Sequence, residues 1–203
     1  MNKIIKNTLI LTIITVVSGL LLGIVYDITK EPIAAAQENS KQEAYRTVLP
    51  DAASFEDYED FDPEDAAALI RDNGYTDDLI EVAAGKSDSG ETVGYVLNVT
   101  SHSGYGGDIQ ISVGILNDGT ISGVEMLSIS ETAGLGMKAD ESDFKDQFKD
   151  KNVESFSYTK NGASADNEID AISGATITTS AVTDAVNSAL VYFHNELGGD
   201  SNE

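Results

Sequence analysis

The most apolar part of the chain is a run of 20 uncharged residues from Asn7 to Tyr26. A helix of this length rises roughly 30 Å, which matches the thickness of a membrane's hydrocarbon core. Lys3 and Lys6 precede the run, so the positive-inside rule places the N-terminus in the cytoplasm and the following residues outside. Small residues at 34–36 suggest a cleaved signal peptide as the alternative, but the run is longer than a signal core and ends well before them. We therefore expect a retained transmembrane helix.

Further along the chain, alternating apolar and polar residues predict a sheet. Residues 93–99 and 109–115 each place apolar side chains at every second position, so each is predicted to be a strand with one buried face. The turn sequence Asn117–Gly119 leads into a third strand over 121–126, which gives an antiparallel meander. Another strand is predicted over 153–158.

Helical spacing is clearest from Ser180 to Leu197, where apolar residues recur at helical intervals before Gly198. Short helices are also predicted over 63–71 and 143–148. The predicted fold class is α+β, with a single domain around a mostly antiparallel sheet and a C-terminal helix, preceded by one transmembrane helix.

The same patterns divide the chain into four segments. We expect a transmembrane anchor over residues 1–27, a stalk helix over 28–50, an extracytoplasmic domain over 51–198 and a disordered tail over 199–203. The stalk helix is predicted from loosely helical apolar spacing that stops at Pro50.

Composition narrows the chemistry that the chain can perform. The chain has no cysteine, which excludes disulfides, thiolate zinc sites and iron–sulfur clusters. His102 and His194 lie far apart in the sequence, so we expect neither a histidine-built metal site nor any other metal ligand. No catalytic residue is predicted. With 12 basic and 35 acidic residues the net charge is -23, which argues against a nucleic-acid partner because phosphate binding depends on Lys and Arg.

Residues 51–65 are rich in Asp and Glu and contain no glycine. A calcium loop needs spaced oxygen ligands around a turn glycine, so the run is interpreted as a solvated acidic face. It nevertheless supports an alternative for the whole chain, a tethered domain that binds ions or solutes.

A turn of small and hydroxyl-bearing residues, 170–178, precedes the last helix. Free N–H groups and the positive end of the helix dipole meet at such a place, which favours a phosphate group. Gly174 and Ala175 leave room for a bulky group near the backbone. The same residue types also occur as ordinary helix caps, so the pattern alone leaves both interpretations open.

Four segments resemble one family. The sequence Asp-x-x-Ser-Gly-Ala-Thr at 170–176 resembles the acceptor motif that flavin transferases recognise when they attach flavin mononucleotide (FMN) to threonine. The loop at 104–109, the Glu-Thr-Ala-Gly-Leu-Gly loop at 131–136 and the end of the stalk at 48–52 are similar to segments of the same proteins. These are the FMN-binding subunits of ion-pumping respiratory complexes, namely RnfG of the Rnf complexes and, more distantly, NqrC of the sodium-translocating NADH:quinone reductase. Ala133 replaces the proline of the family's loop.

The resemblance implies covalent FMN, esterified through its phosphate to Thr176. It also implies that further cofactor-binding residues lie in two segments, Asp170, Ser173, Gly174 and Ala175 in one, and Thr132, Gly134 and Leu135 in the other. Asp170 could orient the acceptor hydroxyl, help the transferase hold its metal or cap a turn. Tyr105 could stack on the flavin or be a buried residue at a strand end.

The function implied is that of an electron-carrying component in an Rnf-type complex, which couples ferredoxin and NAD⁺ to ion translocation. The expected partners are the other membrane subunits and, during maturation, a flavin transferase. The expected location is the cell membrane, with a single pass and an extracytoplasmic domain. A free-standing, membrane-anchored flavoprotein for extracytoplasmic electron transfer is the other alternative.

Overall fold

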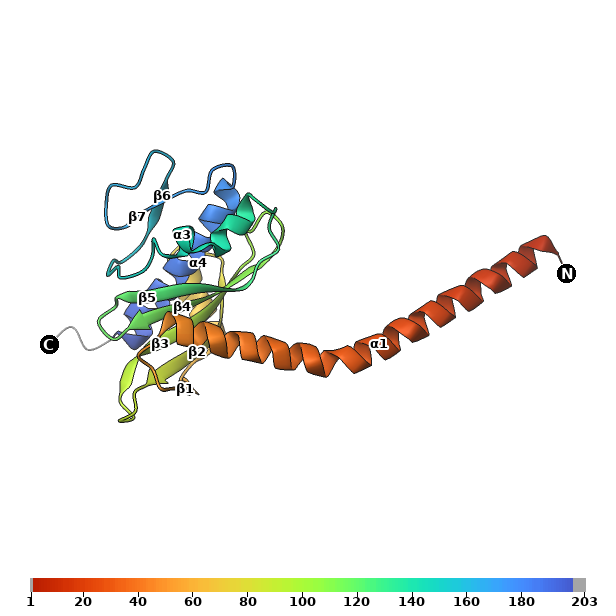
Figure 1. Cartoon of the computed structure of the whole chain (residues 1–203), viewed down its shortest axis with the longest axis horizontal. Coiled ribbons are helices and arrows are strands. Elements are labelled where there is room, and N and C mark those ends of the chain that lie inside the picture. The colour runs from red at the N-terminus through yellow and green to blue at the C-terminus, as the bar shows by residue number, and fades with distance from the viewer. Residues whose placement is uncertain (1, 199–203) are drawn as a thin grey trace. The chain divides into compact units, whose positions relative to one another are not determined.

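The computed structural model describes residues 2–198, so the predicted disordered tail over 199–203 lies outside the described residues. The chain divides into two compact units, with the boundary between Lys41 and Gln42. Helix α1 (Lys3–Val48) begins in the first unit and ends in the second, and it covers both the predicted anchor and the predicted stalk (Figure 1). Its N-terminal part is exposed, and it is long and apolar enough to cross a membrane.

The second unit is built on a five-stranded antiparallel sheet in the order β1-β2-β3-β4-β5. The strands are β1 (Ser54–Asp57), β2 (Asp78–Lys86), β3 (Thr92–Ser101), β4 (Ile109–Leu116) and β5 (Ile121–Ser128). The predicted α+β class and antiparallel meander are confirmed, since β3, β4 and β5 occupy the predicted segments. The sequence patterns did not predict β1 and β2, because β1 is short and acidic and β2 ends in small residues that give no clear alternation.

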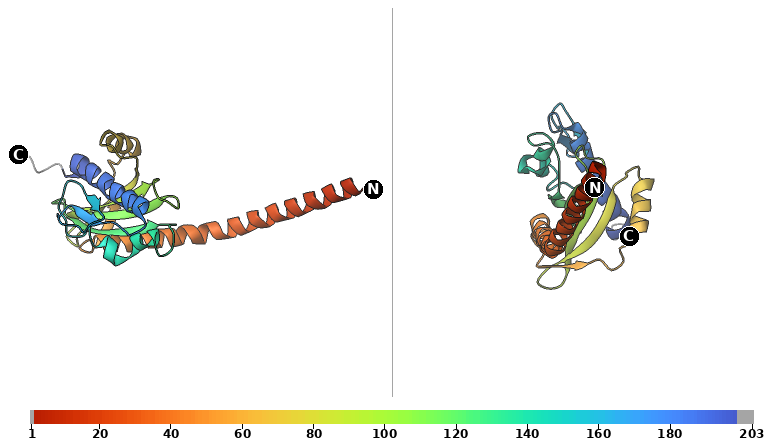
Figure 2. Two further views of the ribbon diagram at one scale, coloured as in Figure 1. Left: turned by 90° about the horizontal axis from the view of Figure 1, so that it is seen from above. Right: turned by 90° about the vertical axis from the view of Figure 1, so that its right-hand side faces the viewer.

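Helices α2 (Pro63–Asp72) and α4 (Thr176–Tyr192) cover one face of the sheet. Helix α2 begins where predicted, and the side chain of Asp62 caps it by accepting hydrogen bonds from the N–H groups of Glu64 and Asp65. Helix α4 packs on β3 and β4 with α2 beside it (Figure 2). The smaller elements are η1 (Gly136–Asp140), α3 (Ser142–Lys145), β6 (Ser157–Thr159), β7 (Glu168–Asp170) and the π-helical turn η2 (Phe193–Leu197).

Two of the predicted elements are shorter in the structure. The helix predicted over 143–148 is reduced to α3, which has four residues. The strand predicted over 153–158 is reduced to β6, which pairs in parallel with β7 as a separate two-stranded sheet. Phe156 lies just before it and is instead held by Asn187 of α4, whose side chain accepts the N–H and donates to the carbonyl of Phe156. These bonds to a helix replace the ladder bonds that a longer strand would need.

The prediction of one buried face for the strands at 93–99 and 109–115 was also wrong, because both faces of the sheet are covered. Leu97 and Ile111 belong to the main core under α4, whereas Val96 packs on the opposite face against Val48 and Leu49 at the end of α1. The stalk's last turn is therefore part of the domain core.

Glycines in adjacent strands make room for this last turn. A Cβ added at Gly114 would collide with the carbonyl of Val48, and one added at Gly85 or Gly94 would contact the side chain of Leu49. The hydroxyl of Ser122 donates to the Val48 carbonyl. The absence of side chains at these positions lets the helix end lie directly on the strands.

Candidate functional site

The structure brings three distant loops together around one pocket of about 540 Å³. They are the β3–β4 loop, the loop after β5 and the turn that leads into α4. The residues that line the pocket are Tyr105, Glu131, Thr132, Leu135, Gly136, Gly174, Ala175, Thr176, Ile177 and Thr178. Five of the predicted cofactor-binding residues, from two separate sequence segments, are among them. A volume of this size falls in the usual range for small-molecule sites, roughly 300–1,000 Å³.

Thr176 is the first residue of α4, so its hydroxyl lies where the helix exposes unpaired N–H groups. This corrects the predicted start at Ser180. The N-cap residue is Ala175, which has no polar side chain, so no cap competes for these groups. The preceding turn is closed by a bond from the Ala175 N–H to the Ile172 carbonyl at 3.0 Å, with Gly174 at φ +79°. This is the type II geometry in which glycine is preferred at the third position.

The loop after β5 makes a matching turn on the other side of the pocket. The N–H of Leu135 donates to the Thr132 carbonyl at 3.1 Å, and Gly134 has φ +74°. Ala133 is the second residue of this turn, the position where proline is favoured because its ring fixes φ. The two turns approach each other, since a Cβ added at Gly174 would lie 3.2 Å from Leu135 Cδ2.

Glu131 lines the pocket and is only 8% exposed. Its Oε1 accepts from the N–H of Gly106 at 3.0 Å, and its Oε2 accepts from the hydroxyl of Thr178 at 3.0 Å. These bonds connect the β3–β4 loop, the loop after β5 and the first turn of α4. Glu131 begins the Glu-Thr-Ala-Gly-Leu-Gly motif but was not predicted to be a site residue.

The rim of the pocket is apolar and open. Tyr105, Leu135 and Ile177 are 70%, 42% and 53% exposed, and a group of exposed apolar side chains around one pocket is typical of a binding site. The interpretation of Tyr105 as a buried strand-end residue was therefore wrong, and its ring is available to a ligand. Ile177, like Thr178 and Gly136, was not predicted. Ile177 and Thr178 were missed because the helix was predicted to begin at Ser180. Its actual start at Thr176 places residues 176–178 on the first turn, beside the pocket.

Three predicted residues do not line the pocket. Ser173 and Gly134 are exposed second and third residues of their turns. Asp170 ends β7, and its Oδ1 accepts from the N–H of Ala163 at 2.7 Å, so its side chain caps the loop between β6 and β7. Of the three roles considered for Asp170, turn capping is the one with a contact in the folded chain.

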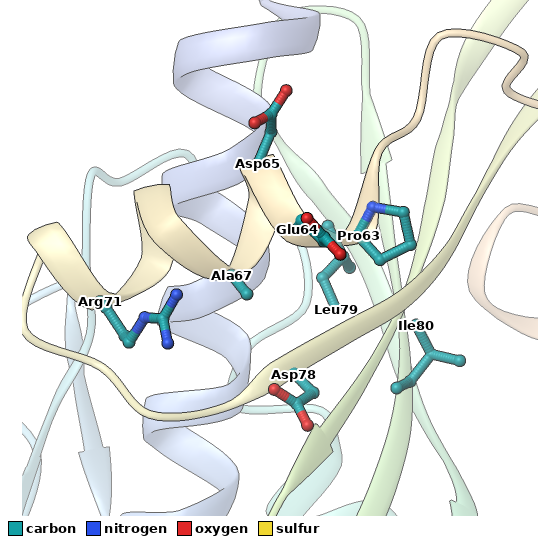
Figure 3. A pocket seen from close by; sticks show the side chains of 8 residues that line it. All are labelled: Pro63, Glu64, Asp65, Ala67, Arg71, Asp78, Leu79 and Ile80. Atoms are coloured by element: carbon teal, nitrogen blue, oxygen red, sulfur yellow. The ribbon is translucent and has the colours of Figure 1, made fainter.

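A second, larger pocket of about 720 Å³ lies between α2 and β2 (Figure 3). It is lined by charged side chains such as Glu64, Arg71 and Asp78 together with the exposed Ile80. None of the predicted site residues lies there. The acidic run over 51–65 contributes to this pocket at its end, where Glu64 and Asp65 form the first turn of α2.

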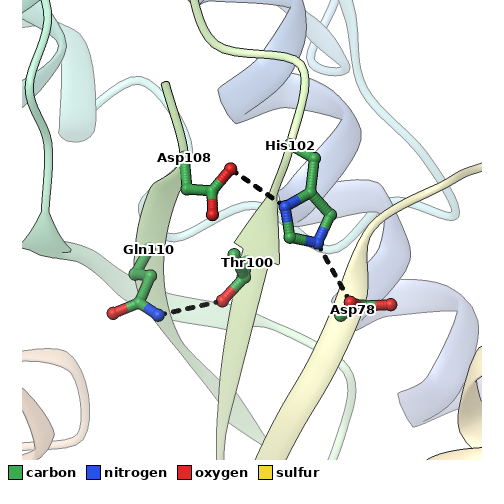
Figure 4. Close-up of polar contacts among 5 residues, drawn as sticks. All are labelled: Asp78, Thr100, His102, Asp108 and Gln110. Atoms are coloured by element: carbon green, nitrogen blue, oxygen red, sulfur yellow. Dashed lines mark hydrogen bonds and ion pairs between the residues drawn. The ribbon is translucent and has the colours of Figure 1, made fainter. Parts of the chain in front are cut away.

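The ends of three neighbouring strands are connected by His102 (Figure 4). Its Nε2 lies 3.0 Å from Asp78 Oδ2 of β2, and its Nδ1 lies 3.0 Å from Asp108 Oδ1 at the start of β4. The hydrogen bonds to Asp78 and Asp108 raise the pKa of His102. His102 and Asp108 lie at the two ends of the β3–β4 loop, so the contact between them closes the base of the loop that carries Tyr105.

Comparison with known proteins gives the class to which this fold and pocket belong. A family model described as an FMN-binding domain matches residues 104–191, which include all three loops of the pocket, and a model of the RnfG N-terminal region matches residues 1–48. Crystal structures of NqrC from Shewanella oneidensis and of the corresponding component of the Na⁺-translocating NADH-quinone reductase from Parabacteroides distasonis share the fold. Each is 20% identical in sequence, with TM-scores of 0.55 and 0.53, covering 77% and 78% of this chain and 95% and 92% of those chains.

The chain belongs to the RnfG family, whose members are components of ion-translocating oxidoreductase complexes. It is 36% identical to the RnfG protein of the Na⁺-translocating ferredoxin:NAD⁺ oxidoreductase complex of Acetobacterium woodii, over 94% of this chain and 91% of the relative. It is 34% identical to the RnfG protein of an ion-translocating oxidoreductase complex of Methanosarcina acetivorans, over 97% and 98%. The family resemblance seen in the sequence is confirmed.

Proposed function

We propose that Thr176 carries FMN through a phosphoester bond and that the chain passes electrons within an Rnf-type membrane complex. The observation that supports this most directly is the position of Thr176, which begins an uncapped helix and lines the pocket formed by the family's FMN-binding domain.

The residues present fit the phosphate end of FMN. The exposed N–H groups and the dipole of α4 favour an anion at the helix start. Thr176 is partly exposed, and its hydroxyl makes no hydrogen bond to another residue within 2–198, so it is open to modification. Gly174, with no side chain, keeps the approach to this hydroxyl clear on the side of Leu135.

The opposite end of the pocket fits an aromatic ring. Tyr105, Leu135 and Ile177 provide apolar surface that would be poorly solvated without a ligand. A bound flavin can accept and donate one or two electrons, and the protein supplies its position and electrostatic environment. An open rim lets a partner reach the ring, which an electron carrier needs.

The rest of the molecule suits a membrane complex. We propose that the apolar part of α1 spans the membrane with the N-terminus in the cytoplasm, because Lys3 and Lys6 precede it. The FMN-binding domain is then extracytoplasmic, its partners are the other membrane subunits of the complex, and a flavin transferase forms the bond to Thr176. The relative from Acetobacterium woodii is part of a complex that acts on ferredoxin and NAD⁺ and translocates Na⁺, and we propose the same reaction class here.

Intact-mass measurement of the full-length protein, co-expressed with a flavin transferase, tests this function. We expect the wild type to gain the mass of one FMN less one water and Thr176→Val to lack it. Ser180→Ala is the matched control, because it removes a hydroxyl one turn further along α4, where Ser180 contacts Asp184. A wild-type protein without the adduct would contradict the proposal.

A further inference from the structure

Glu131 differs from the other pocket residues because its side chain contacts the two other segments of the pocket. Its partners are Gly106, 25 residues earlier, and Thr178, 47 residues later. Both of its oxygens form hydrogen bonds, one with a backbone N–H and one with a hydroxyl.

Two glycines of the site lie against this side chain, Gly136 most closely. A Cβ added at Gly136 would lie 2.6 Å from Glu131 Oε2, and one added at Gly104 would collide with the Gly107 carbonyl and lie 2.9 Å from Glu131 Oε1. Both distances are too short for ordinary contact, so glycine at these positions leaves the volume that the carboxylate occupies. The backbone also packs closely here, since a Cβ at Gly106 would collide with the carbonyl of Ser130. The glycines of the β3–β4 loop thus let its backbone pack closely on itself and against Glu131 and Ser130.

We propose that Glu131 is a positioning residue for the flavin, because its carboxylate joins the Tyr105 loop, the loop after β5 and the start of α4 into one fixed wall. The inference rests on the proposed function, since it concerns the same pocket. Tyr105 is mostly exposed, and its loop is bonded to the rest of the pocket wall at Gly106 through Glu131. Loss of this bond frees the loop, and with it the ring that would face the flavin.

Three substitutions separate positioning from simple loss of stability. Glu131→Gln keeps the size of the side chain, and its amide can accept from Gly106 and donate to Thr178. Glu131→Ala removes both bonds and leaves a cavity. Thr178→Val removes only the bond to the helix and keeps the β-branched shape. Glu81→Gln is the control, because Glu81 hydrogen-bonds to Asn98 within the sheet, outside the pocket.

The experiment uses full-length protein in detergent, co-expressed with a flavin transferase, and records the visible circular dichroism and the fluorescence anisotropy of the flavin. These signals depend on how firmly the ring is held and not on the overall stability of the fold. We expect Glu131→Ala to lose both circular dichroism amplitude and anisotropy, Thr178→Val to show a smaller loss, and Glu131→Gln and Glu81→Gln to match the wild type. If Glu131→Ala does not fold, the loss in Thr178→Val remains the test.

The outcomes distinguish this inference from the proposed function. The positioning role would be overturned if Glu131→Ala kept the flavin on Thr176 and gave wild-type signals. If Glu131→Ala does not fold, the same result in Thr178→Val would overturn it. Either result would leave the electron-carrier function intact. The absence of flavin from the wild type itself would remove both. Loss of attachment in Glu131→Ala that is restored in Glu131→Gln supports the positioning role, because it shows that the shape of the wall decides whether the flavin is accepted.

Discussion

Gly174 combines two requirements at one residue. Its φ of +79° is a conformation that other residues adopt only with strain, and an added Cβ would lie 3.2 Å from Leu135 Cδ2. Gly134, in the facing turn, has φ +74° but no atom within 4 Å of an added Cβ. The two glycines therefore separate the cost of backbone strain from the cost of crowding the pocket.

We predict that Gly174→Ala lowers the free energy of unfolding by more than Gly134→Ala does. Each substitution has a backbone cost of about 1–2 kcal/mol, and only Gly174→Ala also displaces Leu135. Urea unfolding of the two variants measures the difference. Equal losses would show that the turns on the two sides of the pocket do not press on each other.

Ala133 stands where the family has a proline, and the turn in this structure could accept that proline. Ala133 is the second residue of the turn closed by Leu135 and Thr132, and its N–H makes no hydrogen bond to a residue within 2–198. Ala133→Pro should therefore stabilise the protein by about 0.4–1 kcal/mol, because the unfolded chain loses freedom. A rise in the thermal midpoint of Ala133→Pro would confirm this stabilisation. A fall would mean that the backbone at residue 133 does not have the conformation that proline requires.

At the scale of elements, His102 connects β2, β3 and β4 through Asp78 and Asp108. Its pKa is raised by these hydrogen bonds, so folding favours the protonated ring. The resulting stabilisation is complete below the unfolded pKa of about 6.5 and is lost as the pH rises through the higher folded-state pKa. It should be small, because all three side chains are about half exposed.

We therefore predict that wild-type stability falls as the pH rises through this range and that His102→Gln abolishes this part of the pH dependence. The matched control is His194→Gln, since His194 is the other histidine and lies on η2, away from both carboxylates. Thermal midpoints between about pH 6 and pH 9 provide the measurement, spanning the usual range of a raised histidine pKa. Identical pH profiles for wild type and His102→Gln would refute the role of His102.

The elements also show what sequence patterns could and could not predict. The strongly alternating strands β3 and β4 and the turn at 117–119 were predicted correctly, because period-2 patterns with β-branched residues are local signals. The second buried face was missed since it depends on Val48 and Leu49, which arrive from far away in the sequence. The start of α4 was missed because Thr176 follows an apolar residue, Ala175, instead of a capping side chain.

The candidate site was predictable in part for similar reasons. The resemblance pointed to both turns of the pocket, and the structure brings Thr132 and Leu135 to the same pocket as Thr176. The role of Glu131 depends on contacts across 25 and 47 residues of sequence, which no local pattern reveals. An apolar residue such as Ile177 at the start of a helix is expected in the core. Only its 53% exposure in the structure identifies it as part of the pocket rim.

At the scale of the whole molecule, the boundary between the two units falls within α1, before its buried end. Residues 42–203 contain eight basic and 32 acidic residues, so the net charge of the chain is concentrated in the second unit. Repulsion among these like charges opposes folding, and salt weakens it. Apolar burial must offset this repulsion, so we expect the stability of the domain to depend on the burial that the end of α1 provides.

We predict that protein beginning at residue 42 folds cooperatively and that protein beginning at residue 50 does not. The shorter form lacks Tyr45, Val48 and Leu49, which are 1% exposed or less. Burying each such side chain contributes roughly 1.5–3 kcal/mol, and the sum is comparable to the whole stability of a typical domain. Near-ultraviolet circular dichroism and urea unfolding compare the two forms. A cooperative transition in the shorter form would show that the stalk end is dispensable.

The attachment of FMN to Thr176 is the claim on which the electron-carrier account depends. Tandem mass spectrometry of peptides from the protein, co-expressed with a flavin transferase, tests it most directly because it assigns the modified residue. We expect a flavin phosphodiester on the peptide that contains residues 170–178, with the adduct assigned to Thr176 and not to Ser173, Thr178 or Thr179. An adduct on another residue, or unmodified peptide throughout, would contradict it.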